Sequence, residues 1–116
     1  MRNNTNLKAM LAALLALALP TAADATYNAN IYGVITRVRV YDVGLVLITL
    51  QNQPTSTGGG CSASYFAIDP ALDPDIKAMM LSRALVARAS GEVINIGYDN
   101  QGSCAAGYIR VHAIGD

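Results

Sequence analysis

Hydrophobic and polar residues alternate from Tyr27 to Tyr41, with the valines at positions 34, 38 and 40 on one face and Ile35 on the other. A period of two residues is typical of a half-buried β-strand. Asp42-Val43-Gly44 predicts a tight hairpin loop, because glycine readily adopts the positive φ angle that such loops need. The nearly continuous apolar run Leu45 to Leu50 then predicts a second strand that is covered on both faces.

The remainder of the chain predicts three more strands and one helix. The helix lies between Asp73, which suits an N-cap, and Gly91, which suits a C-terminal stop, with Pro74 at its first position. Strands are expected on either side of it, with hydrophobic residues recurring on one face of each (Phe66, Ile68, Ile94, Ile96, Tyr98, Ile109, Val111). Three strands, a helix and two strands is the order of the OB-fold, a five-stranded Greek-key barrel. We therefore predict a mainly β domain with this fold over residues 26–116.

The predicted helix has two apolar arcs, whereas the surface helix of a monomer needs only one. At about 100° per residue, the wider arc is expected to pack on the barrel; it comprises Ala78, Met79, Leu81, Leu85, Val86 and Ala89. The second arc predicts a contact between copies of the chain; it comprises Ile76, Met80, Ala84 and Ala87. The alternative is that alanine and methionine are tolerated on a surface, or that the barrel covers more of the helix.

The first 25 residues have the pattern of a cleavable signal peptide. Arg2 and Lys8 precede an apolar run of Leu and Ala from Leu11 to Leu19, Pro20 follows it, and Ala23-Asp24-Ala25 suits a signal peptidase. A retained membrane anchor is the alternative, but the run is shorter than the roughly 20 residues that span a bilayer. The pattern predicts a periplasmic or secreted protein with no membrane insertion after cleavage.

The two cysteines, Cys61 and Cys104, fit an exported domain of this size. A small core and an oxidising compartment both favour a disulfide bond over two free thiols, which is the alternative. Closing a loop of about 43 residues would stabilise the fold by roughly 4 kcal/mol through the unfolded chain. We therefore predict a disulfide between these two residues.

Charge argues against nucleic acid as a partner. The predicted mature segment has six basic and seven acidic residues, so it produces no strong long-range field. Arg37, Arg39 and Arg110 could lie near one another on outward strand faces, but such a patch is small. The sequence thus favours neutral or protein partners.

Catalytic and metal-binding patterns are not recognisable in the sequence, and we expect no enzyme activity, metal or cofactor. His112 is the single histidine, is expected to point outward, and has no nucleophile or orienting acid in a recognisable arrangement. One histidine and two cysteines do not make a closed zinc site. Asp69, Asp73 and Asp75 lack the spacing of a calcium loop, and Gly58-Gly59-Gly60 lacks the lysine of a phosphate-binding loop.

Recognition by surface contact is the remaining class of function. Tyrosine rings combined with polar loops can hold a neutral sugar by stacking and hydrogen bonding. The candidate ligand-binding residues are Tyr65, Tyr98, Tyr108, Gln51, Asn52 and Asn100.

The order of these segments also resembles a known family. It is similar to the order of segments in small bacterial OB-fold proteins. The segments that carry the similarity are Gly33-Val34-Ile35, Gly44-Leu45-Val46, Cys61 before a strand, the helix from Lys77 to Gly91 and the strand near Cys104. Those proteins are like the pentameric B subunits of A–B toxins of the subtilase-cytotoxin and typhoid-toxin type. The resemblance implies an exported ring of five copies with central helices and glycan binding on the barrel side, without transferring any binding residue. We expect a non-enzymatic binding module, an oligomer that recognises a glycan or a protein; the alternative is a monomeric periplasmic inhibitor or accessory protein that acts through its loops.

Overall fold

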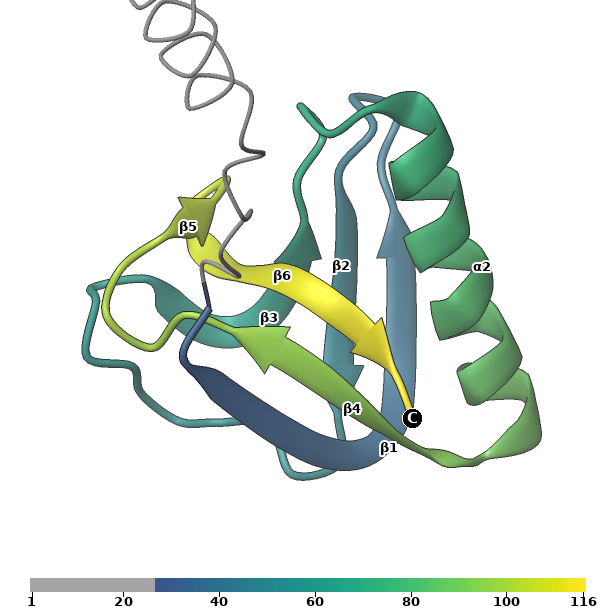
Figure 1. Ribbon diagram of the computed structural model, residues 1–116, viewed down its shortest axis with the longest axis horizontal. Helices are drawn as coiled ribbons and strands as arrows, with labels where there is room; N and C mark the ends of the chain where they lie inside the picture. Colours follow the sequence, from purple (N-terminus) through teal and green to yellow (C-terminus); the bar gives the residue numbers. More distant parts are fainter. Residues whose placement is uncertain (1–26) are drawn as a thin grey trace, which may run out of the picture.

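Five strands pair edge to edge until the sheet closes on itself in the computed structural model, which describes residues 27–116 (Figure 1). The strands are β1 (Ala29–Val40), β2 (Val46–Leu50), β3 (Ser62–Ile68), β4 (Val93–Tyr98) and β6 (Tyr108–Gly115). They run in the order β3-β2-β1-β4-β6, and a parallel pairing of β3 with β6 closes the barrel. This arrangement confirms the predicted OB-fold. The predicted signal peptide lies outside the described residues.

A short extra strand, β5 (Cys104–Ala105), was not predicted. It forms a hairpin with the start of β6. The disulfide between Cys61 and Cys104 is present, with Cα atoms 5.5 Å apart, and it joins the residue before β3 to this hairpin. The loop between β2 and β3 is thereby fixed to the loop between β4 and β5.

The helix α2 (Pro74–Ser90) begins and ends where its capping residues predict. The carboxylate of Asp73 accepts a hydrogen bond from the Asp75 backbone N–H at 2.9 Å. Gly91 has φ 70°, and its N–H donates to the Ala87 carbonyl at 3.0 Å. The helix lies along the side of the barrel and packs against β1, β3 and β6 (Figure 1).

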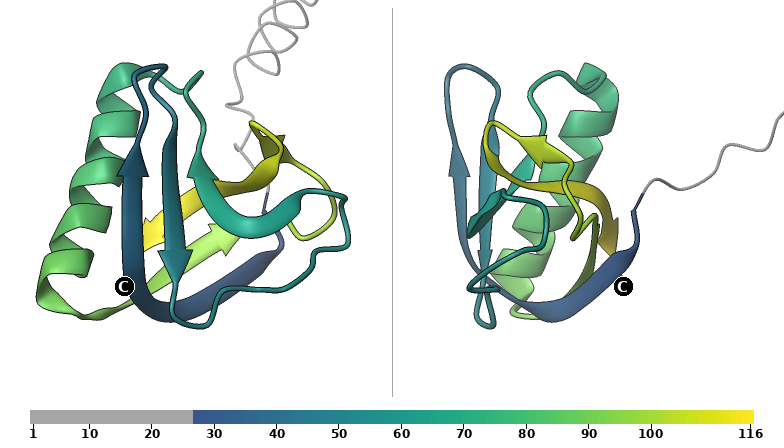
Figure 2. Two further views of the ribbon diagram at one scale, coloured as in Figure 1. Left: turned by 180° about the vertical axis from the view of Figure 1, so that it is seen from behind. Right: turned by 90° about the vertical axis from the view of Figure 1, so that its left-hand side faces the viewer.

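The long strand β1 bends across both halves of the barrel (Figure 2). It pairs with β4 through its first half and with β2 through its second, and the pairing register shifts between Ile35 and Arg37. This bulge reverses the alternation, so Ile35 and Val38 both contact the core although the sequence placed them on opposite faces. Val34 therefore lies outward of the core, and Val40, at the end of the strand, is exposed.

Two hydrophobic clusters result from this arrangement. The larger one fills the barrel and includes Phe66, Ile68, Ile94, Ile96 and Ile109. The smaller one lies outside the barrel wall, where Leu47, Ala67 and Ala105 are buried. The predicted covering of β2 on both faces is confirmed by these clusters, because its residues alternate between them.

Candidate recognition surfaces

The outward side of α2 is apolar. The residues that point away from the barrel include Met79, which is 67% exposed, Val86, which is 59% exposed, and Leu85, which is 48% exposed. Ser82, Ala78 and Ala89 are the other exposed residues along this stripe, and Asp75, Arg88 and Ser90 are exposed toward the ends of the helix. A surface helix normally turns charged residues to water. This face, the outward face of α2, is therefore unusual for a helix that would remain in solvent.

The assignment of the two helical arcs from the sequence was wrong. Ala84 and Ala87, which were expected to contact another copy, are fully buried against the barrel, and Met80 packs on the same core. Ile76, the fourth residue of that arc, is exposed at the start of the helix. The physical reason is size: two alanines let the helix approach the barrel closely, which larger side chains would prevent. Most of the wider arc consequently faces solvent, whereas Leu81 packs on the core.

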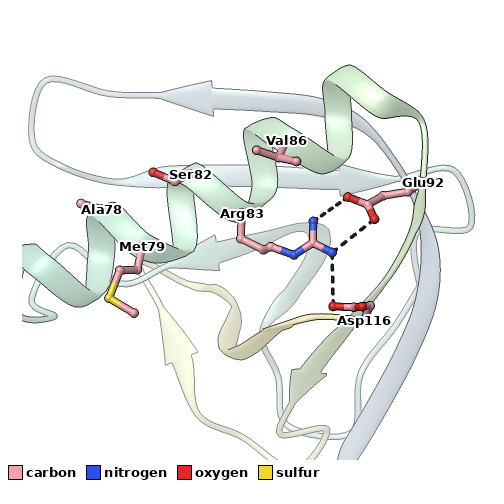
Figure 3. A pocket seen from close by; sticks show the side chains of 7 residues that line it. All are labelled: Ala78, Met79, Ser82, Arg83, Val86, Glu92 and Asp116. Atoms are coloured by element: carbon pink, nitrogen blue, oxygen red, sulfur yellow. Dashed lines mark hydrogen bonds and ion pairs between the residues drawn. The ribbon is translucent and has the colours of Figure 1, made fainter.

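One edge of the outward face carries a charged cluster. Arg83 donates to both carboxylate oxygens of Glu92, at 2.6 and 3.3 Å, and lies 3.5 Å from the Asp116 carboxylate (Figure 3). The hydrogen bonds from Arg83 hold the pKa of Glu92 below its usual value. A shallow cavity of about 710 Å³ lies beside the cluster and is lined by Ala78, Met79, Ser82 and Val86 as well (Figure 3).

The tyrosines chosen from the sequence do not share one site. Tyr65 and Tyr108 meet edge to face on the outer cluster, with ring centres 5.5 Å apart. Tyr98 instead turns toward the core, where its ring lies 5.4 Å from that of Phe66.

The polar candidates are also dispersed. Asn52 lies over β1, where its side-chain amide donates to the Tyr32 carbonyl at 2.9 Å, and the exposed Gln51 precedes it. Asn100 lies in the β4–β5 loop, where its backbone N–H donates to the Asn28 side chain at 3.0 Å. The six predicted ligand residues thus fall in three or more separate places.

The acidic residues near the helix start have structural roles. The Asp69 carboxylate accepts from the Ala71 N–H at 2.9 Å and pairs with Arg110, and these contacts lower its pKa, the backbone hydrogen bond most. Arg110 also donates to the Ser103 hydroxyl and the Cys104 carbonyl, so it ties β6 to the β5 hairpin. Arg39 is engaged elsewhere, with the Tyr41 hydroxyl at 3.4 Å. Within residues 27–116, no three metal-ligating side chains come together.

His112 is half-buried and lies beside the ring of Tyr27, with ring centres 6.1 Å apart. Burial and the positive charge of Arg110 hold its pKa below the usual value. The Tyr27 ring also covers Gly97, where a Cβ atom would lie 2.7 Å from the ring. His112 therefore packs against Tyr27 at the start of the described residues. The strand pattern, which predicted an outward side chain, did not indicate this contact.

Comparison with protein-family models, with curated proteins and with solved structures finds no match to this chain. Among the described residues, no helix is long and apolar enough to span a membrane.

Proposed function

We propose that this chain is an exported, non-enzymatic binding module whose copies associate through the outward face of α2. The observation that carries the proposal is that three large apolar side chains, those of Met79, Leu85 and Val86, are exposed together on that face. The charged side chain of Arg83 lies at the edge of the face and is paired with Glu92. Burying each large apolar side chain there would contribute about 1.5–3 kcal/mol. Its partner is another copy, and the assembled barrels recognise a glycan or a protein.

The charges at the two edges of the outward face support a contact between copies. Arg88 is exposed at one edge and makes that edge positive. At the other edge, the two carboxylates of Glu92 and Asp116 exceed the single positive charge of Arg83, so that edge has a net negative charge. Each copy therefore has a positive edge and a negative edge on either side of an apolar strip. A contact that joins unlike edges is head-to-tail, and repeated head-to-tail contacts close into a ring when the rotation permits. A ring of five is what the resemblance to toxin B subunits implies.

The chemistry of the described residues supports contact rather than catalysis. Cys61 and Cys104 are joined to each other, so neither offers a thiolate nucleophile. His112 is half-buried and packed beside Tyr27. The Asp69–Arg110 pair connects structural elements.

A charge placed within the outward face tests this proposal. Val86→Asp should dissociate the assembly, because it would bury an unpaired carboxylate at the contact. Val43→Asp is the matched control, because Val43 is an exposed valine in the β1–β2 hairpin. Light scattering at micromolar concentration should give one copy for the first variant and the wild-type mass for the second. Equal masses for wild type and Val86→Asp would contradict the proposal, and a mass of one copy for both would favour a monomer that acts through its loops.

A further inference from the structure

The second half of β1 has a free hydrogen-bonding edge. β1 pairs with β4 only through Ala29–Val34, whereas its residues 35–40 pair with β2 alone. Among residues 27–116, no other strand lies beside this part of β1. Figure 2 shows α2 next to it, but α2 packs on the side that faces the core, where Ala84 and Ala87 are buried in the same cluster as Ile35. We call residues 37–40 the open edge of β1.

The pairing with β2 decides which backbone groups point to the open edge. The Tyr41 N–H donates to the Leu45 carbonyl at 2.9 Å, and antiparallel pairs alternate between hydrogen-bonded and non-hydrogen-bonded positions. Arg39 is therefore bonded to β2, and Val38 and Val40 direct their N–H and C=O groups away from it. Within the described part of the chain, no hydrogen bond to these outward groups is formed. An unpaired strand edge of this kind can accept another strand.

Two positive charges lie along the open edge. Arg37 and Arg39 are both exposed, and Val38 between them contacts the core. The two arginines therefore share the outward face of the strand, about 6.6 Å apart along it. The ion pairs found in residues 27–116 involve neither of them, and Arg39 donates to the neutral hydroxyl of Tyr41 at 3.4 Å. The open edge thus has positive charge that no described carboxylate balances.

This charge favours an acidic partner strand. Residues of an added strand that lie directly opposite Arg37 and Arg39 would be two apart in their own sequence, and opposite charges at such positions attract. Two copies of the open edge would instead bring four arginines together, and like charges across strands are destabilising. The edge therefore selects against pairing with itself.

We propose that the open edge of β1 binds an extended acidic segment of a partner protein, which joins the sheet as an additional strand. The backbone of the segment would hydrogen-bond with Val38 and Val40, and acidic side chains at every second position would face Arg37 and Arg39. A nucleic acid could contact the arginines but has no peptide backbone to pair with the edge. The proposal rests on the proposed function only in taking contact with a partner as the role of the domain.

Calorimetry with a short peptide in which glutamate and valine alternate tests the proposal on the wild-type protein. The reference peptide has the same residues, with the glutamates and the valines in separate blocks. The alternating peptide should bind at least about tenfold more tightly, because it alone places acids opposite both arginines while its backbone pairs with the edge. An alternating peptide with lysine in place of glutamate should not bind.

A substitution at Val40 tests the role of the backbone. Val40 is 59% exposed, and Val40→Pro removes an N–H that points to the open edge while leaving the hydrogen bonds to β2. This variant should bind the alternating peptide at least about tenfold more weakly than wild type. Val40→Thr is the matched control, because it keeps the N–H and the branched shape, and it should bind as wild type. Unfolding temperatures of both variants are measured alongside.

Substitution of both arginines tests the role of charge. The double variant Arg37→Glu, Arg39→Glu should lose the alternating peptide, whereas Arg37→Lys, Arg39→Lys should keep most of its affinity. A single-stranded oligonucleotide that displaces the peptide and still binds Val40→Pro would overturn the proposal in favour of a nucleic acid partner.

Three further results would overturn the proposal: no binding of the alternating peptide, equal affinity for the two glutamate peptides, or wild-type affinity in Val40→Pro. Its failure can be distinguished from failure of the proposed assembly. Val86→Asp should keep the affinity for the alternating peptide while losing the mass of the assembly. Conversely, Val40→Pro should keep the mass while losing the peptide.

Discussion

Val86 and Ala87 are adjacent in sequence and lie about 100° apart around the axis of α2, yet one faces solvent and the other faces the barrel. Ala87 is fully buried against the barrel, whereas Val86 is largely exposed. The barrel accepts the small side chain, and the large apolar one points into solvent. The inward and outward sides of the helix thus differ in side-chain size more than in polarity. Hydrophobicity alone therefore assigned the two sides incorrectly.

The close approach of α2 to the barrel predicts a strong dependence on side-chain volume at position 87. Ala87→Leu should destabilise the fold by about 1–3 kcal/mol, because added methylenes have no room in a packed interface. Ala71→Leu is the control at an exposed alanine outside the helix and its contact face, where the change should be within about 0.5 kcal/mol. Urea unfolding of both variants measures the difference. Equal stability of the two would show that Ala87 does not limit the approach.

The disulfide predicts a large loss of stability when both cysteines are replaced. The double variant Cys61→Ala, Cys104→Ala should lose roughly 4 kcal/mol, because the bond closes a loop of 43 residues. Chemical denaturation measures the loss, and reduction of the wild-type protein should reproduce it. A loss below about 1 kcal/mol would mean that the loops remain ordered without the bond.

The close approach of Gly33 to Asn52 predicts that the effects of substitutions at these two positions on stability are not additive. A Cβ atom at position 33 would run into the side-chain oxygen of Asn52, which would have to turn away and lose its hydrogen bond to the Tyr32 carbonyl. Gly33→Ala should therefore cost about 0.5–1.5 kcal/mol. Adding Asn52→Ala should recover part of that cost, because it removes the obstructing atoms. A double-mutant cycle measures the coupling. Strictly additive effects would indicate that the loop moves away freely.

The Asp69 carboxyl predicts a specific dependence of stability on pH. Its pKa is lowered in the folded state, so its stabilising effect is present above the unfolded value of about 3.9 and is lost as pH falls through the folded value. Asp69→Asn should therefore be less stable than wild type at pH 7. The difference should shrink as the pH falls below about 4. Thermal unfolding across this range measures it, and a difference that did not change with pH would exclude the ionised carboxylate as its cause.

Local features of the fold could be predicted because local interactions determine them. Asp73 and Gly91 set the ends of α2 through contacts within a few residues, and Gly44 sets the hairpin, with φ 81°. The cysteine pair could be predicted as well, since chain length and export favoured it.

Features that depend on pairing between distant segments could not be predicted. The bulge in β1 depends on the register with β2, and the strand pattern gives no sign of it. Likewise, Asn30 and Asn95 meet because β1 pairs with β4, and they are 65 residues apart in the chain. Tyr98 was predicted both on the apolar face of its strand and among the ligand-binding residues, and its contact with Phe66 supports the first of these placements.

The mass of the wild-type protein in solution, measured by sedimentation velocity on residues 26–116 over a range of micromolar concentrations, tests the central claim most directly. A helix face with large exposed apolar side chains that contacts another copy predicts a single species heavier than one copy, which persists on dilution. A particle with the mass of one copy at every concentration would contradict the account, since Met79 and Val86 would then remain in water.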